Sequence, residues 1–164
     1  MIKIDMGSGV SKRAGYFTVD MDQSVKADIC LDVEGAQAGA ILYEVKKLTG
    51  GDDRVDEIRA HHILEHIRPE NKVRVMRMFY DVLVPGGILD IEVPYFPHPA
   101  SVQDPTHISF WSKESFWYFI KDNKFGEAFA KRYSRFTVPL FDLVEDWKRG
   151  KEGNYWAYGI KLKK

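Results

Sequence analysis

The sequence predicts an α/β fold built on a mostly parallel sheet of about seven strands with an antiparallel edge. Short strand-like segments alternate with amphipathic helical stretches, which is typical of such sheets. The strand-like segments also alternate apolar and charged residues, which predicts helices mainly on one face. With 164 residues, of which 45% are hydrophobic, the chain is long enough for one domain, 1–164, with its own core.

The predicted strands are short segments that are rich in apolar residues at alternating positions and that end at turn residues. They comprise residues 1–5, 15–20, 27–33, 54–61, 88–94, 128–141 and 154–163. The first ends at the Gly7-Ser8-Gly9 turn, and only five residues separate Gly9 from Gly15, too few for a helix. The first βα unit is therefore shortened. The last two strands are expected to form an antiparallel edge hairpin, although the connection between them is long for one.

Three helices are predicted between these strands. Residues 35–51 carry an apolar stripe at helical spacing and end in two glycines. Residues 69–87 begin with proline, which favours the first turn of a helix, and carry a second stripe. After a loop containing four prolines, Ser112 has the character of an N-cap for a helix that reaches about Asn123.

The alternation within the strands predicts one polar face of the sheet, because successive side chains point to opposite faces. We expect Lys3, Glu57, Arg59, Asp90 and Glu92 on one face, and Ile2, Ile4, Ile58, Leu89 and Ile91 on the other. Burying such charges without partners is costly. The polar face should therefore be solvated, covered by a loop or used by a partner, and Arg59 should pair with Asp90 or Glu92 if their strands are neighbours.

Composition limits the classes of partner. Lys plus Arg and Asp plus Glu both number 24, so the zero net charge predicts no strong attraction to nucleic acid or to an anionic membrane. Cys30 is the only cysteine, which fits a reducing compartment. No apolar run approaches the roughly 20 residues of a membrane span, and no signal peptide is indicated. We expect a cytoplasmic protein that is a monomer or a homodimer.

Acids and glycines follow the predicted strands at the edge where ligands bind in open α/β sheets, beyond the carboxyl ends of the strands. The Gly7-Ser8-Gly9 turn lies at such an end, as do Asp20 and Asp32. Glycines let a ligand approach the backbone closely, and a carboxylate can accept hydrogen bonds from both hydroxyls of a ribose. This combination predicts a cofactor that contains a nucleoside.

The order of these segments resembles that of a known family. "IKIDMGSG", "GYFTVDMD", "ADICLDV", "VDEIRAHHILEHI" and "VLVPGGILDIEVP" follow one another as in class I S-adenosylmethionine-dependent methyltransferases, and the group with the type 11 catalytic domain is the most similar. The later "DPTHISFWSKESF" is similar to a segment of other predicted members. The resemblance covers roughly residues 2–120. It implies a Rossmann-like fold and S-adenosyl-L-methionine as the cofactor.

The resemblance also implies roles for individual residues. The implied cofactor-binding residues are Asp5, Gly7, Ser8, Gly9, Asp20, Asp32, Val33, His61 and His62. The glycine turn would pass the methionine part, Asp20 would bind the ribose, and Asp32 with its neighbour would flank the adenine. The backbone around the two histidines would line the site below the sulfonium. Ser11 stands where the family's first motif has its third glycine.

Two groups of histidines raise further hypotheses. "HILEH", residues 62–66, matches the His-x-x-Glu-His pattern of a zinc protease family, and a zinc hydrolase is therefore one alternative. The stretch lies at a strand-to-helix junction, a third ligand is not evident, and we expect no metal. His107 follows the proline-rich loop, and with Asp104 to orient it the imidazole can act as a general base. The alternative is that Asp104 caps a turn and His107 packs locally.

The leading hypothesis is an enzyme that transfers a methyl group from S-adenosylmethionine to an O or N nucleophile of a small-molecule or sugar-like acceptor. A nucleic-acid amino-methyltransferase is disfavoured, because "AHHI" replaces the Pro-Pro-aromatic segment that such enzymes use. The second hypothesis is a non-catalytic module that binds S-adenosylmethionine, or keeps only the methyltransferase shape, and acts in an assembly.

Overall fold

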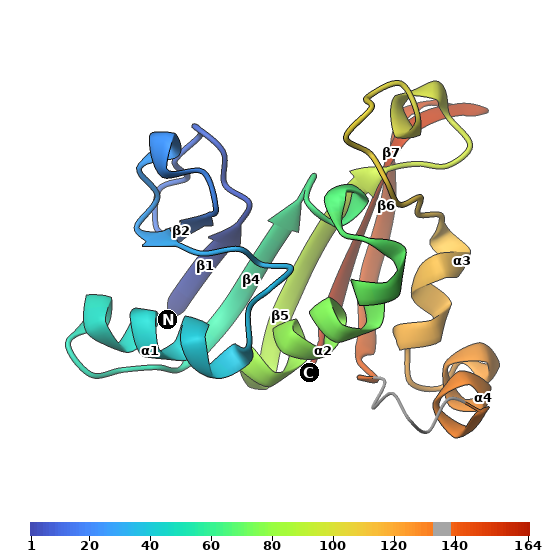
Figure 1. The fold of residues 1–164 in the computed structure, drawn as a ribbon. Coiled ribbons are helices and arrows are strands. Elements are labelled where there is room, and N and C mark those ends of the chain that lie inside the picture. Colours follow the sequence, from blue (N-terminus) through green and yellow to red (C-terminus); the bar gives the residue numbers. More distant parts are fainter. Residues whose placement is uncertain (133–138) are drawn as a thin grey trace.

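The computed structural model describes residues 1–132 and 139–164, and its centre is a seven-stranded sheet in the order β3-β2-β1-β4-β5-β7-β6 (Figure 1). The strands are β1 (Ile2–Met6), β2 (Phe17–Asp20), β3 (Ile29–Cys30), β4 (Val55–His61), β5 (Leu83–Pro94), β6 (Asp142–Lys151) and β7 (Asn154–Lys163). The pairs among the first five strands are parallel, whereas β7 runs antiparallel to β5 and β6. The predicted fold class, with its antiparallel edge, is confirmed.

The helices are short, and Figure 1 shows the first two in front of the sheet and the last two beside its β6 edge. They are α1 (Ala38–Thr49), α2 (Lys72–Val82), α3 (Lys113–Phe116) and α4 (Lys124–Arg132). Residues 7–16, all of which are described, contain no helix between β1 and β2, so the shortened first unit is confirmed. Among residues 1–132 and 139–164, no helix is long and apolar enough to cross a membrane.

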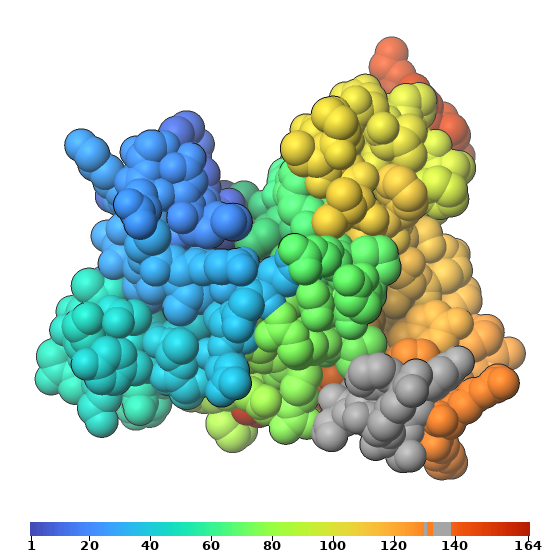
Figure 2. Space-filling model, viewed as in Figure 1, coloured from blue at the N-terminus to red at the C-terminus, as the bar shows by residue number. Residues whose placement is uncertain are grey.

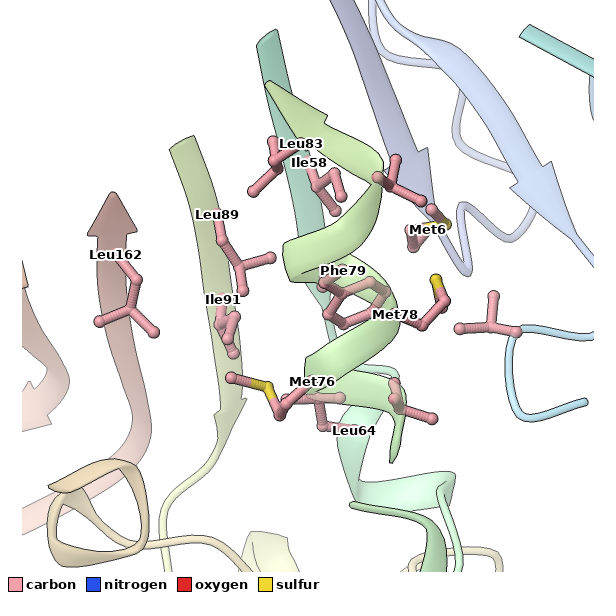
Figure 3. Close-up of a cluster of buried hydrophobic side chains, with 14 of the residues drawn as sticks. Met6, Ile58, Leu64, Met76, Met78, Phe79, Leu83, Leu89, Ile91 and Leu162 are labelled. Carbon is pink, nitrogen blue, oxygen red and sulfur yellow. The ribbon is translucent and has the colours of Figure 1, made fainter. Parts of the chain in front are cut away.

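The core lies between α2 and the central strands (Figure 3). Phe79 and Met76 of α2 are fully buried against the apolar face, where Ile58, Leu89 and Ile91 are also fully buried. Burial of each such side chain contributes roughly 1.5–3 kcal/mol. This packing holds β4 and β5 side by side, and the functional site described below begins where β4 ends.

The register of the strands confirms the separation into an apolar and a polar face. Ile4 of β1 is the neighbour of Ile58 in β4, which is in turn the neighbour of Leu89 in β5. One residue further along, Asp5, Arg59 and Asp90 are neighbours in the same way and point to the opposite face.

The charges on the polar face pair with one another, although not as predicted. Arg59 Nη1 donates to both carboxylate oxygens of Asp5, at 2.9 and 3.1 Å, and not to Asp90 or Glu92. Asp90 instead lies 2.9 Å from Nε2 of His61. Glu92 accepts a 2.5 Å hydrogen bond from Arg149 of the edge strand β6. The sequence pattern did not indicate β6 as a strand, so the prediction lacked this arginine.

The main correction concerns the C-terminal part. The strand predicted over 128–141 is wrong: α4 covers its beginning, residues 133–138 lie outside the described residues, and β6 starts at Asp142. The expected connection to the last strand is itself β6, an edge strand with mostly exposed side chains. Such a strand carries little apolar periodicity, and its pairing with β7 decides its conformation.

Two helix boundaries also differ from the prediction. Ser112 does occupy the N-cap position of α3, where its backbone N–H donates to Ser115 Oγ at 3.1 Å. The helix changes to a 3₁₀ turn at Trp117–Phe119 and does not continue to residue 123. The helix predicted over 69–87 is α2, which ends at Val82 because β5 starts at the next residue.

Candidate functional site

A pocket of about 300 Å³ opens at the carboxyl ends of β1, β2 and β4. Figure 2 shows the surface hollowed between the blue segments that follow β1 and β2 and the yellow loop that follows β5. The lining residues are Gly7, Gly9, Asp20, Met21, Leu31, Asp32, Val33, Glu34, His62, Ile63, His66 and Ile67. The structure thus brings six of the nine implied cofactor-binding residues to one cavity.

The glycine turn forms one wall of this pocket, and its backbone requires glycine. Gly7 has a φ of +66°, and its N–H donates to the carbonyl of Val19 at 2.8 Å. A Cβ at Gly7 would lie 2.7 Å from Cδ1 of Ile63. Gly9 has a φ of +55°, and its N–H donates to Oδ2 of Asp20 at 2.9 Å. The turn is therefore folded onto the end of β2.

Alanine at Gly7 is expected to lower the free energy of unfolding by about 2–3 kcal/mol, because a left-handed backbone and a steric clash add together. Gly15 is the matched control, since it has a φ of +83° but no atom within 4 Å of the position that a Cβ would occupy. Gly15→Ala should therefore lower the free energy of unfolding by only about 1 kcal/mol, which is the cost of the left-handed backbone alone. Urea unfolding measures both, and equal losses would contradict the close packing of Gly7 against Ile63.

Two acids, Asp20 and Asp32, line the same pocket as the glycine turn. Asp20 ends β2; its Oδ2 accepts the Gly9 N–H, and its Oδ1 accepts the Asp22 N–H at 3.0 Å. Asp32 lies at the pocket rim, and its Oδ1 accepts the Glu34 N–H at 2.8 Å. These backbone bonds orient both carboxylates, and each oxygen retains a lone pair for a ligand hydroxyl.

Asp5, Ser8 and His61 are the three implied residues that do not line the pocket. Asp5 is 2% exposed on the polar face, where Arg59 engages both of its oxygens. His61 lies on the same face with its ring nitrogens 2.9 Å from Arg59 and 2.9 Å from Asp90. Ser8 supports the turn by donating its N–H to the Val19 carbonyl at 3.2 Å. The order of the motifs predicted that these residues contact the cofactor. Because side chains alternate along a strand, those of Asp5 and His61 point to the polar face and not into the pocket.

His62 adds a charged group to the pocket wall. It has a φ of +55°, and its ring lies 3.4 Å from Glu65 Oε1 and 3.3 Å from Glu92 Oε1. Hydrogen bonding to Glu65, and then to Glu92, raises the pKa of His62 to about 9. The imidazole is therefore protonated at neutral pH and faces both carboxylates as an ion-pair partner.

The carboxylate of Glu92 connects the pocket wall to the edge strand. Burial raises the pKa of Glu92, but hydrogen bonds from His62, Arg149 and Trp147 together outweigh burial and lower it to about 2. The ordinary value is 4.5, so the folded protein holds the charged form more strongly than the unfolded chain does.

Glu92 should make the protein sensitive to acid. Because its pKa is lowered on folding, its stabilisation is complete above pH 4.5 and is lost as the pH falls towards 2. The expected loss is about 2–3 kcal/mol of unfolding free energy. Urea unfolding from pH 6 to pH 2 measures it, and Glu92→Gln should lack this part of the pH dependence. Parallel pH profiles for the two proteins would contradict the assignment.

His107 and Asp104 lie beside the pocket without lining it. The His107 side chain is 11% exposed, and its ring packs edge-on against His66 with the centroids 5.0 Å apart. Its Nε2 lies 3.9 Å from Asp104 Oδ2, while Asp104 Oδ1 accepts the N–H of Thr106 at 2.8 Å. Asp104 therefore caps a turn and also faces the imidazole. The general-base role of His107 stays a prediction.

Some pocket residues carried no chemical signal in the sequence. Ile63, Met21, Leu31 and Ile67 are apolar and contribute walls, and only the fold shows that they meet. His66 belongs to the "HILEH" segment, but its place in the pocket depends on the 3₁₀ turn Leu64–His66. A ligand in the pocket would therefore meet apolar walls beside the acids and glycines.

A larger pocket of about 470 Å³ lies between α2, α3 and α4 and, in the part of the chain that is described, shares no lining residue with the first. Five of its eleven described lining residues are aromatic. Lys72 crosses it with Nζ 4.4 Å from the centre of the Trp111 ring and 3.0 Å from the Phe110 carbonyl, and burial lowers the pKa of Lys72 to about 8. The smaller pocket is nevertheless the candidate functional site, because it combines the strand ends, the glycine turn and the acids.

Solved structures with this architecture are numerous, although no family model and no curated protein sequence matches the chain. A S-adenosylmethionine-dependent methyltransferase from Archaeoglobus fulgidus is similar with a TM-score of 0.64 and 15% identity, over 99% of this chain and 85% of that one. The 1,6-didemethyltoxoflavin-N1-methyltransferase of Burkholderia thailandensis, solved with 1,6-didemethyltoxoflavin and S-adenosylhomocysteine bound, has a TM-score of 0.59 and 12% identity, over 99% and 70%.

A third similar structure belongs to an enzyme of another class. The [4+2]-cyclase SpnF has a TM-score of 0.59 and 12% identity, over 99% of this chain and 73% of its own. At such identities the comparisons establish the architecture alone. This chain's own sheet has a parallel centre and an antiparallel edge. The chain has the Rossmann-like fold of the class I S-adenosylmethionine-dependent methyltransferases.

Proposed function

We propose that this protein is a S-adenosylmethionine-dependent methyltransferase that acts on an O or N nucleophile of a small-molecule or sugar-like acceptor. One observation carries the proposal. The glycine turn and Asp20 meet in a pocket at the carboxyl ends of the strands, joined by the 2.9 Å hydrogen bond from Gly9 N to Asp20 Oδ2. Ligands of open α/β sheets bind at this edge.

The lining residues fit the chemical parts of the cofactor. Gly7 and Gly9 lack side chains where the chain turns, so the methionine part can approach the backbone. The carboxylate of Asp20, already oriented by two backbone N–H groups, accepts hydrogen bonds from the ribose hydroxyls. Val33 is buried beside the more accessible Asp32, which gives the adenine an apolar wall with a polar rim.

The acceptor would enter from the hollow between the blue segments and the yellow loop (Figure 2). Methyl transfer depends mainly on holding the nucleophile in line with the methyl group, so the loop after β5 would serve to position it. His107, with Asp104 to orient it, would remove the proton from the nucleophile. A small acceptor is supported by the zero net charge, which offers no strong attraction to nucleic acid.

Calorimetry with S-adenosylhomocysteine tests the first half of this proposal, and an assay for S-adenosylhomocysteine release over a panel of hydroxyl and amine acceptors tests the second. We expect saturable binding of one ligand per chain and release that depends on the acceptor. Absence of binding would contradict the cofactor assignment. Binding without turnover for any acceptor would favour the non-catalytic module, in which the pocket serves recognition only.

A further inference from the structure

Three potential metal ligands converge from two separate segments beside the pocket. Glu65 and His66 belong to the 3₁₀ turn Leu64–His66, and His107 comes from the loop after β5. One donor atom from each of the three side chains lies within 4.8 Å of the other two. The sequence pattern suggested no third ligand, because His107 is distant from the turn along the chain.

Two atoms of this cluster are buried without a partner. Glu65 is 2% exposed, and its Oε2 has no hydrogen-bond partner among the described residues. Nδ1 of His107 is buried and likewise unpartnered there. Leaving a buried polar atom unsatisfied costs about 1–3 kcal/mol, so two such atoms in one cluster need an explanation. A ligand shared by both atoms supplies one.

The remaining atoms of the three side chains face outer partners. His66 Nδ1 lies 3.1 Å from the Thr106 carbonyl, which can only accept a hydrogen bond, so Nε2 is the nitrogen left to bind a metal ion. His107 Nε2 faces Asp104 at 3.9 Å, and Glu65 Oε1 faces His62 at 3.4 Å. Metal-binding histidines typically have their second nitrogen oriented by a carbonyl or a carboxylate in this way.

Backbone bonds hold the two segments together. The N–H groups of Ile108 and Ser109 both donate to the Glu65 carbonyl, at 2.9 and 3.0 Å, and Ser109 Oγ donates to the Leu64 carbonyl at 2.8 Å. The loop that carries His107 is therefore fastened to the turn that carries the other two donors. The cluster is a consequence of this docking.

We infer that Glu65, His66 and His107 form a binding site for a divalent transition metal ion, with zinc as the best match. Two imidazoles and one carboxylate are a donor set that zinc accepts, with a fourth position left for water or substrate. Tetrahedral zinc with bonds of about 2.0–2.1 Å holds its ligands about 3.4 Å apart, so donors that lie within 4.8 Å of one another need to approach by up to about 1.4 Å. His62 is not part of the set, unlike the first histidine of the His-x-x-Glu-His pattern.

The ion would lie at the wall of the candidate cofactor pocket, because His66 belongs to both. If the proposed methyl transfer is correct, a hydroxyl bound at the fourth position would lose its proton more easily there, since a divalent ion lowers its pKa. This consequence rests on the proposed function, whereas the site itself does not. Metal ligation and the general-base role both require Nδ1 of His107, so they exclude each other.

Titration of the full, untagged chain with Co²⁺, followed by its visible absorption, tests the site in the absence of S-adenosylmethionine; Zn²⁺ then competes for it. We expect saturable binding of one Co²⁺ ion per chain, with the intense visible absorption band that is typical of four-coordinate Co²⁺. His66→Ala, an exposed position that should not disturb folding, is expected to weaken binding at least about 100-fold. Asp104→Asn removes only an outer partner and should cost about 10-fold.

His98→Asn is the matched control. His98 lies in the same loop outside the cluster, and asparagine can keep the acceptor that His98 Nδ1 offers to the Ala100 N–H. Its affinity for Co²⁺ should equal that of the parent protein. The inference is overturned if the parent protein shows no saturable band, or if His66→Ala retains it. A protein that binds Co²⁺ but not S-adenosylhomocysteine would keep this site and lose only the proposed methyl transfer.

Discussion

Replacing Asp20 with alanine should weaken the binding of S-adenosylhomocysteine by about 30- to 1,000-fold, which corresponds to about 2–4 kcal/mol. The carboxylate would lose its charge-assisted hydrogen bonds to the ribose hydroxyls. It would also release the N–H of Gly9, which it holds at 2.9 Å, so the glycine turn would be less well oriented. Calorimetry on the parent protein and on the variant measures the difference.

Asp20→Asn separates these two contributions, because the amide oxygen can still accept the Gly9 N–H while the charge is gone. Its loss of affinity should be smaller than that of Asp20→Ala. Asp22→Ala is the control, since Asp22 is an exposed acid two residues away that does not line the pocket. If Asp20→Ala binds as tightly as the parent protein, or no more weakly than Asp22→Ala, the ribose assignment is wrong.

The sequence was a good guide where local chemistry determines the structure. β1, β2, β4 and residues 88–94 of β5 alternate apolar with polar residues and end at turn residues, and their conformation needs little information from distant segments. The same holds for the glycine turn, which follows β1, and for Asp20, which is the last residue of β2, because the carboxyl ends of parallel strands lie at the same edge of a sheet.

The sequence was a poor guide where pairing between distant segments decides. β6 is a ten-residue strand with mostly exposed side chains, so its local pattern does not distinguish it from a charged connection. Its partner β7 supplies the hydrogen bonds that make it a strand. For the same reason, the sequence did not predict that two residues of β6, Trp147 and Arg149, donate hydrogen bonds to Glu92 on the polar face.

The candidate site shows the same division. Motif order assigned Asp5 and His61 to the cofactor, but the direction of a strand side chain follows from register, which places both on the polar face. The meeting of His66 with His107 depends on how the loop after β5 docks on the turn after β4. No spacing rule connects those two segments, so only the tertiary structure reveals the cluster.

The polar face itself is explained by the ion pairs that cross it. Lys3 lies 2.6 Å from Glu57, and Arg59 joins Asp5 on one side to His61 on the other. Charges that would be costly alone therefore satisfy one another where residues 7–16 provide no covering helix. The shortened first unit and the paired charges are parts of one arrangement.

Removing one partner from this network should destabilise the protein strongly. Asp5→Ala is expected to lower the free energy of unfolding by about 3 kcal/mol, because it leaves the partly buried Arg59 without its carboxylate. Nε of Arg59 already lacks a hydrogen-bond partner among the described residues, which leaves the guanidinium little alternative. Urea unfolding at neutral pH measures the loss.

Asp81→Ala is the matched control for that measurement, since Asp81 pairs with Arg77 on the exposed surface of α2 and should contribute at most about 0.5 kcal/mol. The same Asp5 variant separates a structural role from a cofactor role. If Asp5 acts through Arg59, the folded variant should bind S-adenosylhomocysteine with nearly the affinity of the parent protein. A large loss of affinity without a loss of stability would instead support the contact with the cofactor that the family resemblance implies. A loss of stability no greater than that of Asp81→Ala would show that the buried pair does not hold β1 to β4.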